Sequence, residues 1–196
     1  MMKMKNKWKW LFLMLLTLNI AVILLISILI FDTPEDVQDP EINIKTENMS
    51  EFTISTDKHD LNRLINHYIE KEGLNGPINY YIKLTDEVEL FGEIKVFSKT
   101  LQLRMTFEPQ ALENGDLLLV QKSLSLGGIK LPVERILKFI QDGYKLPEWV
   151  IIQPNDKKIY VALQEMRLNG GIQVRAEEFD VAKNNISMRM LVPVSQ

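Results

Sequence analysis

The longest uninterrupted apolar stretch of the chain lies near its amino terminus. Residues 10–31, WLFLMLLTLNIAVILLISILIF, contain no charged side chain. At about 1.5 Å of rise per residue, a helix of this length spans about 33 Å, slightly more than the roughly 30 Å hydrocarbon core of a bilayer. The pattern therefore predicts a transmembrane anchor over residues 10–31.

Charges flank this stretch unevenly, because lysines dominate residues 1–9 and acidic residues dominate the segment from Asp32 onward. Lysines are retained on the cytoplasmic side of a membrane, so we expect a cytoplasmic basic N-terminus and an extracellular C-terminal domain. The alternative is a cleaved signal peptide, whose apolar core is usually about 7–15 residues and ends in small residues. The exit segment SILIFDTPED offers bulky residues instead, which favours an uncleaved signal-anchor.

The hydrophobic pattern changes after the anchor. Residues 32–50 are acidic, contain two prolines and show no sustained apolar period, which indicates a solvated spacer. Residues 51–196 alternate between helical and two-residue periods, as expected of an extracytoplasmic α+β domain.

Two short amphipathic helices are predicted in this domain. Apolar residues recur at three- and four-residue spacing over residues 61–69, and Gly73 ends the pattern. Thr56 or Asp57 is placed to cap this helix. The same spacing recurs over residues 133–140, between the segment GGIKLP (residues 127–132) and Gly143.

The remaining segments alternate apolar and polar residues, as strands do when one face is buried. Glycine, asparagine and proline turn signals separate them, so we expect a curved antiparallel sheet with the two helices against it. The predicted strands are residues 52–55, 88–96, 101–107, 117–120, 149–153, 158–166, 171–179 and 185–194.

The two halves of the domain resemble each other. A shift of about 72 residues superposes the two helical patterns, and a shift of 71 lays LQLRMTFEPQALENG on IQVRAEEFDVAKNNI, with Arg104 on Arg175. Two readings stay open: a duplicated unit of one helix plus a β-meander, or a coincidence between two amphipathic segments.

Charge and cysteine content limit the partners. The chain holds 23 Lys and Arg against 26 Asp and Glu, and because four lysines precede the anchor, the rest is acidic by about seven charges. An acidic domain has no basic face for phosphates, so we expect no nucleic-acid partner. The chain has no cysteine, so its domain must be held by its own core rather than by disulfides.

Catalytic and metal-binding patterns are weak. The chain lacks a cysteine nucleophile and a G-x-S-x-G elbow. His59 and His67 are eight residues apart, about two helical turns, which is too far to share one metal ion. Asp57 and Asp60 beside His59 are better explained by helix capping. We therefore expect no enzyme, no metal site and no cofactor.

Binding remains as the expected role. The apolar faces of the strands need cover, and two narrow helices leave an apolar groove against a curved sheet. Arg104 and Arg175 are candidates to meet an anionic head group, although pairing with acidic residues on neighbouring strands is the alternative. The candidate lining residues, for which core packing is the alternative, are large or flexible: Met105, Phe107, Met166, Met188 and Met190.

Several phrases resemble one known family. LSLGGIKLPVERIL, YKLPEWVIIQPNDKKIYVAL and NGGIQVRAEEFDVAKNNISMRMLVP, together with the anchor and acidic spacer, are similar to the YpmS-type proteins of low-GC Gram-positive bacteria. The likeness extends over nearly the whole chain and supplies no active-site residues. Because genes of this family tend to neighbour one for a secreted SGNH-type lipase or esterase, the resemblance implies work on lipids or the envelope. A looser architectural similarity is to TULIP-like lipid-binding domains.

We therefore expect a single-pass, membrane-anchored, non-enzymatic domain that binds a lipid or another amphiphile, such as a lipid-linked intermediate, at the cell envelope. The alternative is an interaction accessory, which would use an exposed sheet edge or apolar patch to hold an envelope enzyme such as a lipase or esterase at the cell surface.

Overall fold

The structure is a computed structural model, and it describes residues 5–31, 49–73, 80–96, 99–128, 132–143, 146–166 and 168–194. Most of the predicted spacer, residues 32–48, lies outside the described residues, as do residues 1–4. The chain divides into two compact units, residues 1–33 and 34–196, which we describe separately.

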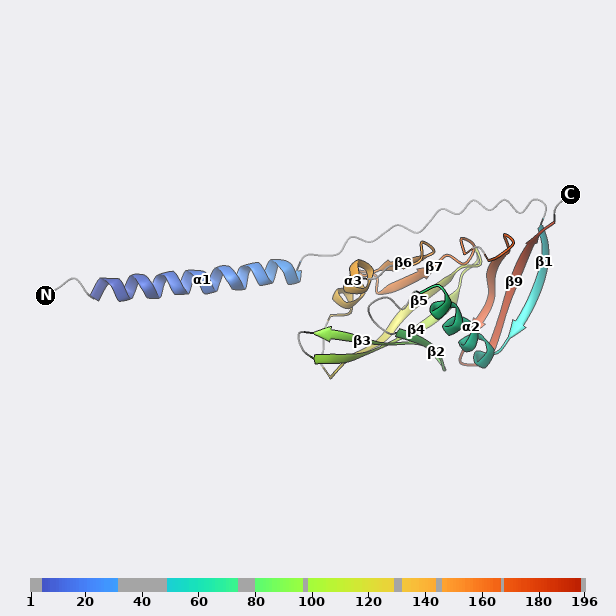
Figure 1. Cartoon of the computed structure of the whole chain (residues 1–196), viewed down its shortest axis with the longest axis horizontal. Coiled ribbons are helices and arrows are strands. Elements are labelled where there is room, and N and C mark those ends of the chain that lie inside the picture. Colours follow the sequence, from blue (N-terminus) through green and yellow to red (C-terminus); the bar gives the residue numbers. More distant parts are fainter. Residues whose placement is uncertain are drawn as a thin grey trace. The chain divides into compact units, whose positions relative to one another are not determined.

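The first unit is the apolar helix α1, Lys5–Phe31 (Figure 1). Its segment Lys7–Leu25 is long and apolar enough to cross a membrane. Two polar side chains bond within the helix: Thr17 Oγ1 donates to the Leu13 carbonyl at 3.0 Å and Asn19 Nδ2 to the Leu15 carbonyl at 2.8 Å. Polar groups satisfied in this way need no water, so α1 is consistent with membrane anchoring.

The second unit is an α+β domain with two antiparallel sheets, as the alternating pattern predicts. One sheet has the strand order β2-β3-β4-β5-β7-β6 and the other the order β1-β9-β8. The helices are α2 (Lys58–Lys71) and α3 (Val133–Gly143). The strands are β1 (Met49–Thr56), β2 (Tyr80–Leu84), β3 (Val88–Val96), β4 (Lys99–Ala111), β5 (Leu117–Leu126), β6 (Val150–Gln153), β7 (Lys158–Val161), β8 (Gln173–Asp180) and β9 (Asn185–Pro193).

The internal similarity holds for the order of elements. One helix followed by four strands occurs twice, as α2-β2-β3-β4-β5 and as α3-β6-β7-β8-β9. The strand pairing differs between the halves. Strands β2 to β5 form one meander, whereas β6 and β7 extend that same sheet and β8 and β9 form a separate sheet with β1. The repeat is therefore one of element order and does not extend to sheet pairing.

The core lies between the sheets and helices. Met105 and Phe107 of β4 are 0% and 1% exposed, and Leu137 of α3 is 0% exposed. The register of β4 against β5 shifts between Thr106 and Phe107, whose partners Ser123 and Gln121 are separated by one extra residue of β5. A second shift lies between Ala176 and Glu178 of β8.

The turn between β4 and β5 connects the two sheets. The backbone N–H of Ala176 on β8 donates to the Gly115 carbonyl at 2.7 Å. A Cβ on Gly115 would lie 2.6 Å from Cβ of Arg175, and Gly115 has φ +90°. Glycine is therefore required here both by the backbone conformation and by the close approach of β8.

The strand predicted over residues 158–166 is too long. β7 ends at Val161, and the chain then turns, with Leu163 N–H donating to the Val161 carbonyl. Buried Asp116 holds this turn, since its Oδ1 accepts from Gln164 N–H at 3.2 Å while its Oδ2 accepts from the Tyr160 hydroxyl. The buried carboxylate of Asp116 requires hydrogen-bond donors, and the turn after Val161 supplies one of them, the backbone N–H of Gln164.

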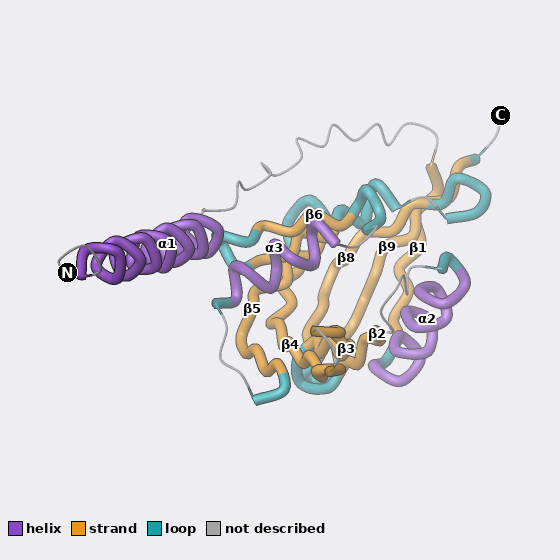
Figure 2. The backbone as a smooth tube through the Cα atoms, turned by 60° about the vertical axis from the view of Figure 1, so that its left-hand side comes forward, coloured by secondary structure: helices purple, strands orange, loops and turns teal. Residues whose placement is uncertain are grey.

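Helix α2 closes the outer edge of β2, beside which it lies (Figures 1 and 2). Leu84 N–H donates to Asn62 Oδ1 at 2.7 Å, and Asn62 Nδ2 donates to the Leu84 carbonyl at 3.1 Å. Asn66 bonds Ile82 in the same two ways, at 3.0 and 2.7 Å. The two carboxamides therefore replace the hydrogen bonds of a neighbouring strand.

Helix α3 makes a related contact at the opposite end of the sheet. Gln141 Nε2 donates to the Ile152 carbonyl of β6, the other outermost strand, at 3.2 Å. Each helix thus bonds the strand that follows it, which is a further likeness between the two halves.

Candidate functional site

The three-stranded sheet carries an apolar strip on one face. Side chains directly opposite each other in antiparallel strands share a face, as do side chains two residues apart along one strand. Phe52 of β1 lies opposite Met190 of β9, and Ile54 lies opposite Met188. We call these four residues the β1–β9 strip.

The strip runs from the core to an open border. At its inner end, Ala176 of β8 lies opposite Met188 and is 3% exposed, and Met188 packs against the core. At its outer end, Phe52 is 53% and Ile54 is 44% exposed. The strip thus offers an apolar surface that begins at the core and ends in solvent along β1.

Three of the five predicted apolar lining residues lie elsewhere. Met105 and Phe107 belong to the core cluster, so neither reaches a surface. Met166 is half-buried and follows the turn after β7. Met188 and Met190 are the predicted residues that the structure brings together.

Arg104 is paired with an acidic residue on the neighbouring strand. Its Nη2 lies 3.0 Å from Glu89 Oε2, and its Nε donates to the same oxygen at 3.1 Å. Burial of Glu89 disfavours its charge, but hydrogen bonds from Arg104 and Thr85 and the positive charge of Arg104 outweigh this cost and hold the pKa of Glu89 below its ordinary value. Arg104 therefore pairs with an acidic residue on the neighbouring strand, which was the alternative to binding a head group.

An aromatic pair lies beside this ion pair. The rings of Tyr81 and Phe91 stack with centroids 4.9 Å apart, and the Arg104 guanidinium carbon lies 5.6 Å from the Phe91 centroid. Tyr81 is 52% exposed. This polar face of the six-stranded sheet is a second, separate surface that combines aromatic and charged groups.

Arg175 lies on the face of the three-stranded sheet opposite the strip, in register with Arg189. Arg189 Nη1 lies 2.9 Å from Glu51 Oε1, and the hydrogen bond and charge of Glu51 raise the pKa of Arg189. Nε and Nη2 of Arg175 are buried and have no hydrogen-bond partner within the part of the chain that the structure describes. Arg175 is therefore not placed to meet a head group at the strip.

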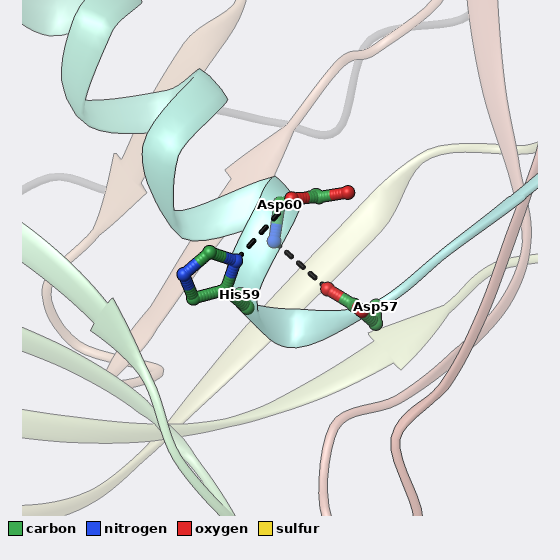
Figure 3. Close-up of side chains that lie close together, drawn as sticks. All are labelled: Asp57, His59 and Asp60. Atoms are coloured by element: carbon green, nitrogen blue, oxygen red, sulfur yellow. Dashed lines mark hydrogen bonds and ion pairs between the residues drawn. The ribbon is translucent and has the colours of Figure 1, made fainter.

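The cluster of Asp57, His59 and Asp60 lies at the start of α2 (Figure 3). Asp57 Oδ1 accepts from Asp60 N–H at 2.8 Å, which is the predicted N-cap. His59 Nδ1 and Arg63 Nη2 lie 3.3 and 3.5 Å from Asp60 Oδ1. The three residues are exposed with ligand atoms within 4.8 Å of one another, and their bonds are those of a helix start.

Phe52 and Ile54 were not among the predicted site residues. Both lie in the predicted strand over residues 52–55, and their alternation indicates an apolar face. The sequence alone does not show that this strand lies at the edge of its sheet, which is what leaves the two side chains exposed.

Comparison with known proteins agrees with the sequence resemblance. Residues 6–192 match the family described as "Uncharacterized protein conserved in bacteria (DUF2140)". The chain is 31% identical to the "Uncharacterized protein YpmS" of Bacillus subtilis (strain 168) over 155 residues, which cover 78% of this chain and 82% of that protein. No solved structure matches the chain. The chain therefore belongs to the DUF2140 family and is a relative of YpmS.

Proposed function

We propose that the protein is a membrane-anchored, extracytoplasmic binding domain without catalytic activity, and that the β1–β9 strip binds an acyl chain of a lipid or another envelope amphiphile. The observation that carries the proposal is the exposure of Phe52 and Ile54 beside two methionines, in a chain that also holds an apolar helix.

The chemistry of the strip suits a hydrocarbon chain. Removal of acyl methylenes from water contributes about 0.8 kcal/mol each, so an apolar strip favours the hydrocarbon part of an amphiphile. Met188 and Met190 have flexible, polarisable side chains that adapt to an irregular guest. The exposed side chains of Phe52 and Ile54 allow a chain to lie along this face of the sheet.

Anchoring supplies the ligand. A domain joined to a membrane helix has acyl chains as its most abundant apolar neighbours, so modest affinity suffices. The lysines before the anchor favour placing the domain on the outer side of the membrane, where envelope lipids and lipid-linked intermediates are handled.

Photolabelling tests the proposal. The full-length chain would be reconstituted in vesicles that contain a phospholipid with a diazirine near the end of one acyl chain, irradiated, and digested for mass spectrometry. We expect label on peptides that contain residues 52–54 and 188–190, in addition to α1. The double variant Phe52→Ser/Ile54→Ser should lose most of the domain label and keep the label on α1.

Leu64→Ser is the matched control, because Leu64 is 64% exposed on α2 and lies outside the strip. This variant should label as the unaltered chain does. Label confined to α1 in the unaltered chain, or equal loss in Leu64→Ser, would overturn the proposal.

A second candidate function is that of an accessory for an envelope enzyme. It is favoured by exposed Tyr81 stacked on Phe91 beside Arg104, since tyrosine and arginine are enriched at the energetic centres of protein interfaces. Tyr81→Ala should then abolish co-purification with an envelope lipase or esterase, whereas Phe52→Ser/Ile54→Ser should not. The opposite pattern would contradict it.

A further inference from the structure

The outer edge of β1 has no paired strand among the residues that the structure describes. Among the strands that the structure describes, none pairs with the side of β1 that faces away from β9, and Figure 1 shows β1 as the outermost strand there. The side chains of residues 51–55 are exposed on both faces of the strand. An eight-residue strand with a free edge is a template for another strand.

Other outer strands of the domain have polar partners. Asn62 and Asn66 bond β2, Gln141 bonds β6, and the Gly115 carbonyl bonds β8. The open edge of β1 is therefore an exception within a fold that otherwise places hydrogen-bonding groups against its outermost strands.

The sequence of β1 is complementary to itself. An antiparallel pair of β1 strands centred on Thr53 places Phe52 opposite Ile54 of the second copy, twice by symmetry, and Thr53 opposite Thr53. Aromatic and β-branched residues are favourable cross-strand neighbours, as are two threonines. The residues paired in this register are an even number of positions apart in the sequence, or identical. Alternate residues of a strand direct their backbone N–H and C=O groups to the same edge, so both members of each pair direct these groups either toward the partner strand or away from it.

Charge does not oppose this pairing. Glu51 is the one charged residue of MSEFTIST, and it would lie opposite Ser55 of the second copy. Glu51 is already neutralised by Arg189 within its own chain at 2.9 Å. The pair therefore sets no like charges opposite each other.

From these features we infer that β1 pairs antiparallel, about Thr53, with the β1 of a second copy of this chain. The contact is small and of low affinity in solution, but anchors confine both copies to one membrane, which raises their effective concentration. The inference is independent of lipid binding. It also joins two β1–β9 strips side by side, because Phe52 and Ile54 of both copies share one face.

Cysteine cross-linking tests this register, since the chain has no cysteine of its own. Opposed residues of antiparallel strands have Cα atoms about 4.5 or 5.5 Å apart, which is within disulfide range. Full-length Thr53→Cys in vesicles should therefore form a disulfide dimer under mild oxidation. Gln102→Cys, exposed on the interior strand β4, is the control.

We expect the dimer yield of Thr53→Cys to exceed that of Gln102→Cys by at least about tenfold at equal density. Equal yields would indicate random collision and would overturn the inference, as would no dimer from Thr53→Cys. Thermal unfolding checks that both variants are folded.

A charge exchange gives a second measurement. Two copies of Thr53→Lys, or two of Thr53→Glu, would set like charges opposite each other, whereas a mixture would set opposite charges. With distinct fluorophores on the two variants, energy transfer in vesicles should be high for the mixture and low within either variant. Energy transfer in the mixture that is no higher than within either variant alone would overturn the inference, even if one variant were less stable.

Discussion

The outer strands β2 and β1 have opposite surroundings. Both end a sheet, but β2 makes four hydrogen bonds with the carboxamides of Asn62 and Asn66, two as donor and two as acceptor. Among described residues, β1 makes no such bond on its free side. β1 precedes α2 in the chain and β2 follows it, so a neighbouring helix in the sequence does not by itself protect the edge of a strand. The difference lies in Asn62 and Asn66, whose spacing of four residues places both side-chain amides along β2. The domain thus protects the edge of β2 and leaves the edge of β1 without such protection.

The largest expected effect comes from removing this protection. Asn62→Ala/Asn66→Ala leaves the N–H and carbonyl groups of Leu84 and Ile82 without partners. At about 1 kcal/mol for each lost bond, the free energy of unfolding should fall by about 3–4 kcal/mol. Urea unfolding of the full-length chain measures the change.

Thr53→Ala on β1 is the matched control for this comparison. In dilute detergent, where β1 does not pair with a second copy, it removes an exposed side chain from an unpaired edge, so we expect a change within about 0.5 kcal/mol. Equal losses in the two variants would mean that the asparagine bonds contribute nothing beyond an ordinary surface substitution.

An intermediate effect is expected where the β4–β5 turn meets β8. Gly115→Ala would place Cβ 2.6 Å from Arg175 Cβ at φ +90°, and should lower the free energy of unfolding by about 2 kcal/mol. Gly170→Ala has nearly the same backbone, φ +83°, with nothing within 4 Å. It should cost only about 1 kcal/mol, and the difference between them, read from thermal unfolding, reports the close approach.

The smallest effect concerns an ion pair between β3 and β4, which lies on a face of the larger sheet rather than at its edge. Glu89→Gln removes the ion pair to Arg104, whose side chain is 54% exposed, so solvent screening limits the loss to about 1 kcal/mol or less. The folded pKa of Glu89 is lowered, so the pair stabilises the fold above the unfolded pKa, and this contribution disappears as the pH falls through the folded pKa.

The pH dependence separates the charge from its hydrogen bonds. In unfolding measured from neutral to acidic pH, the unaltered chain should lose its advantage over Glu89→Gln in the acidic range. A constant difference at every pH would show that ionisation of Glu89 is not its source.

Sequence periodicity predicted the N-terminal apolar helix and both domain helices, and it limited the cap of α2 to Thr56 or Asp57, because each depends on local spacing. It missed β2, whose five residues are too short to establish a period and whose outer edge is satisfied by a helix. It extended β7 beyond Val161, because an apolar run does not reveal that Asp116, 48 residues away from Gln164, holds a turn. Such contacts depend on tertiary structure.

The candidate site was predicted in part for the same reason. Met105 and Met188 share the same alternating pattern and both lie on interior strands, but Met105 is fully buried, whereas Met188 on β9 is partly exposed beside the edge strand β1. Alternation of apolar and polar residues shows on which face of a strand a side chain lies. It does not show whether other parts of the protein cover that face. Phe52 and Ile54 became identifiable once the strand order placed β1 outermost.

The asparagine bonds to β2 also make this edge sensitive to a change of a single side-chain nitrogen. Hydrolysis of either carboxamide to a carboxylate keeps the acceptor but removes the donor, so a backbone carbonyl of Ile82 or Leu84 would face a negative charge. A slow, spontaneous ageing reaction at a single nitrogen would thus expose the edge of the larger sheet to aggregation with other chains.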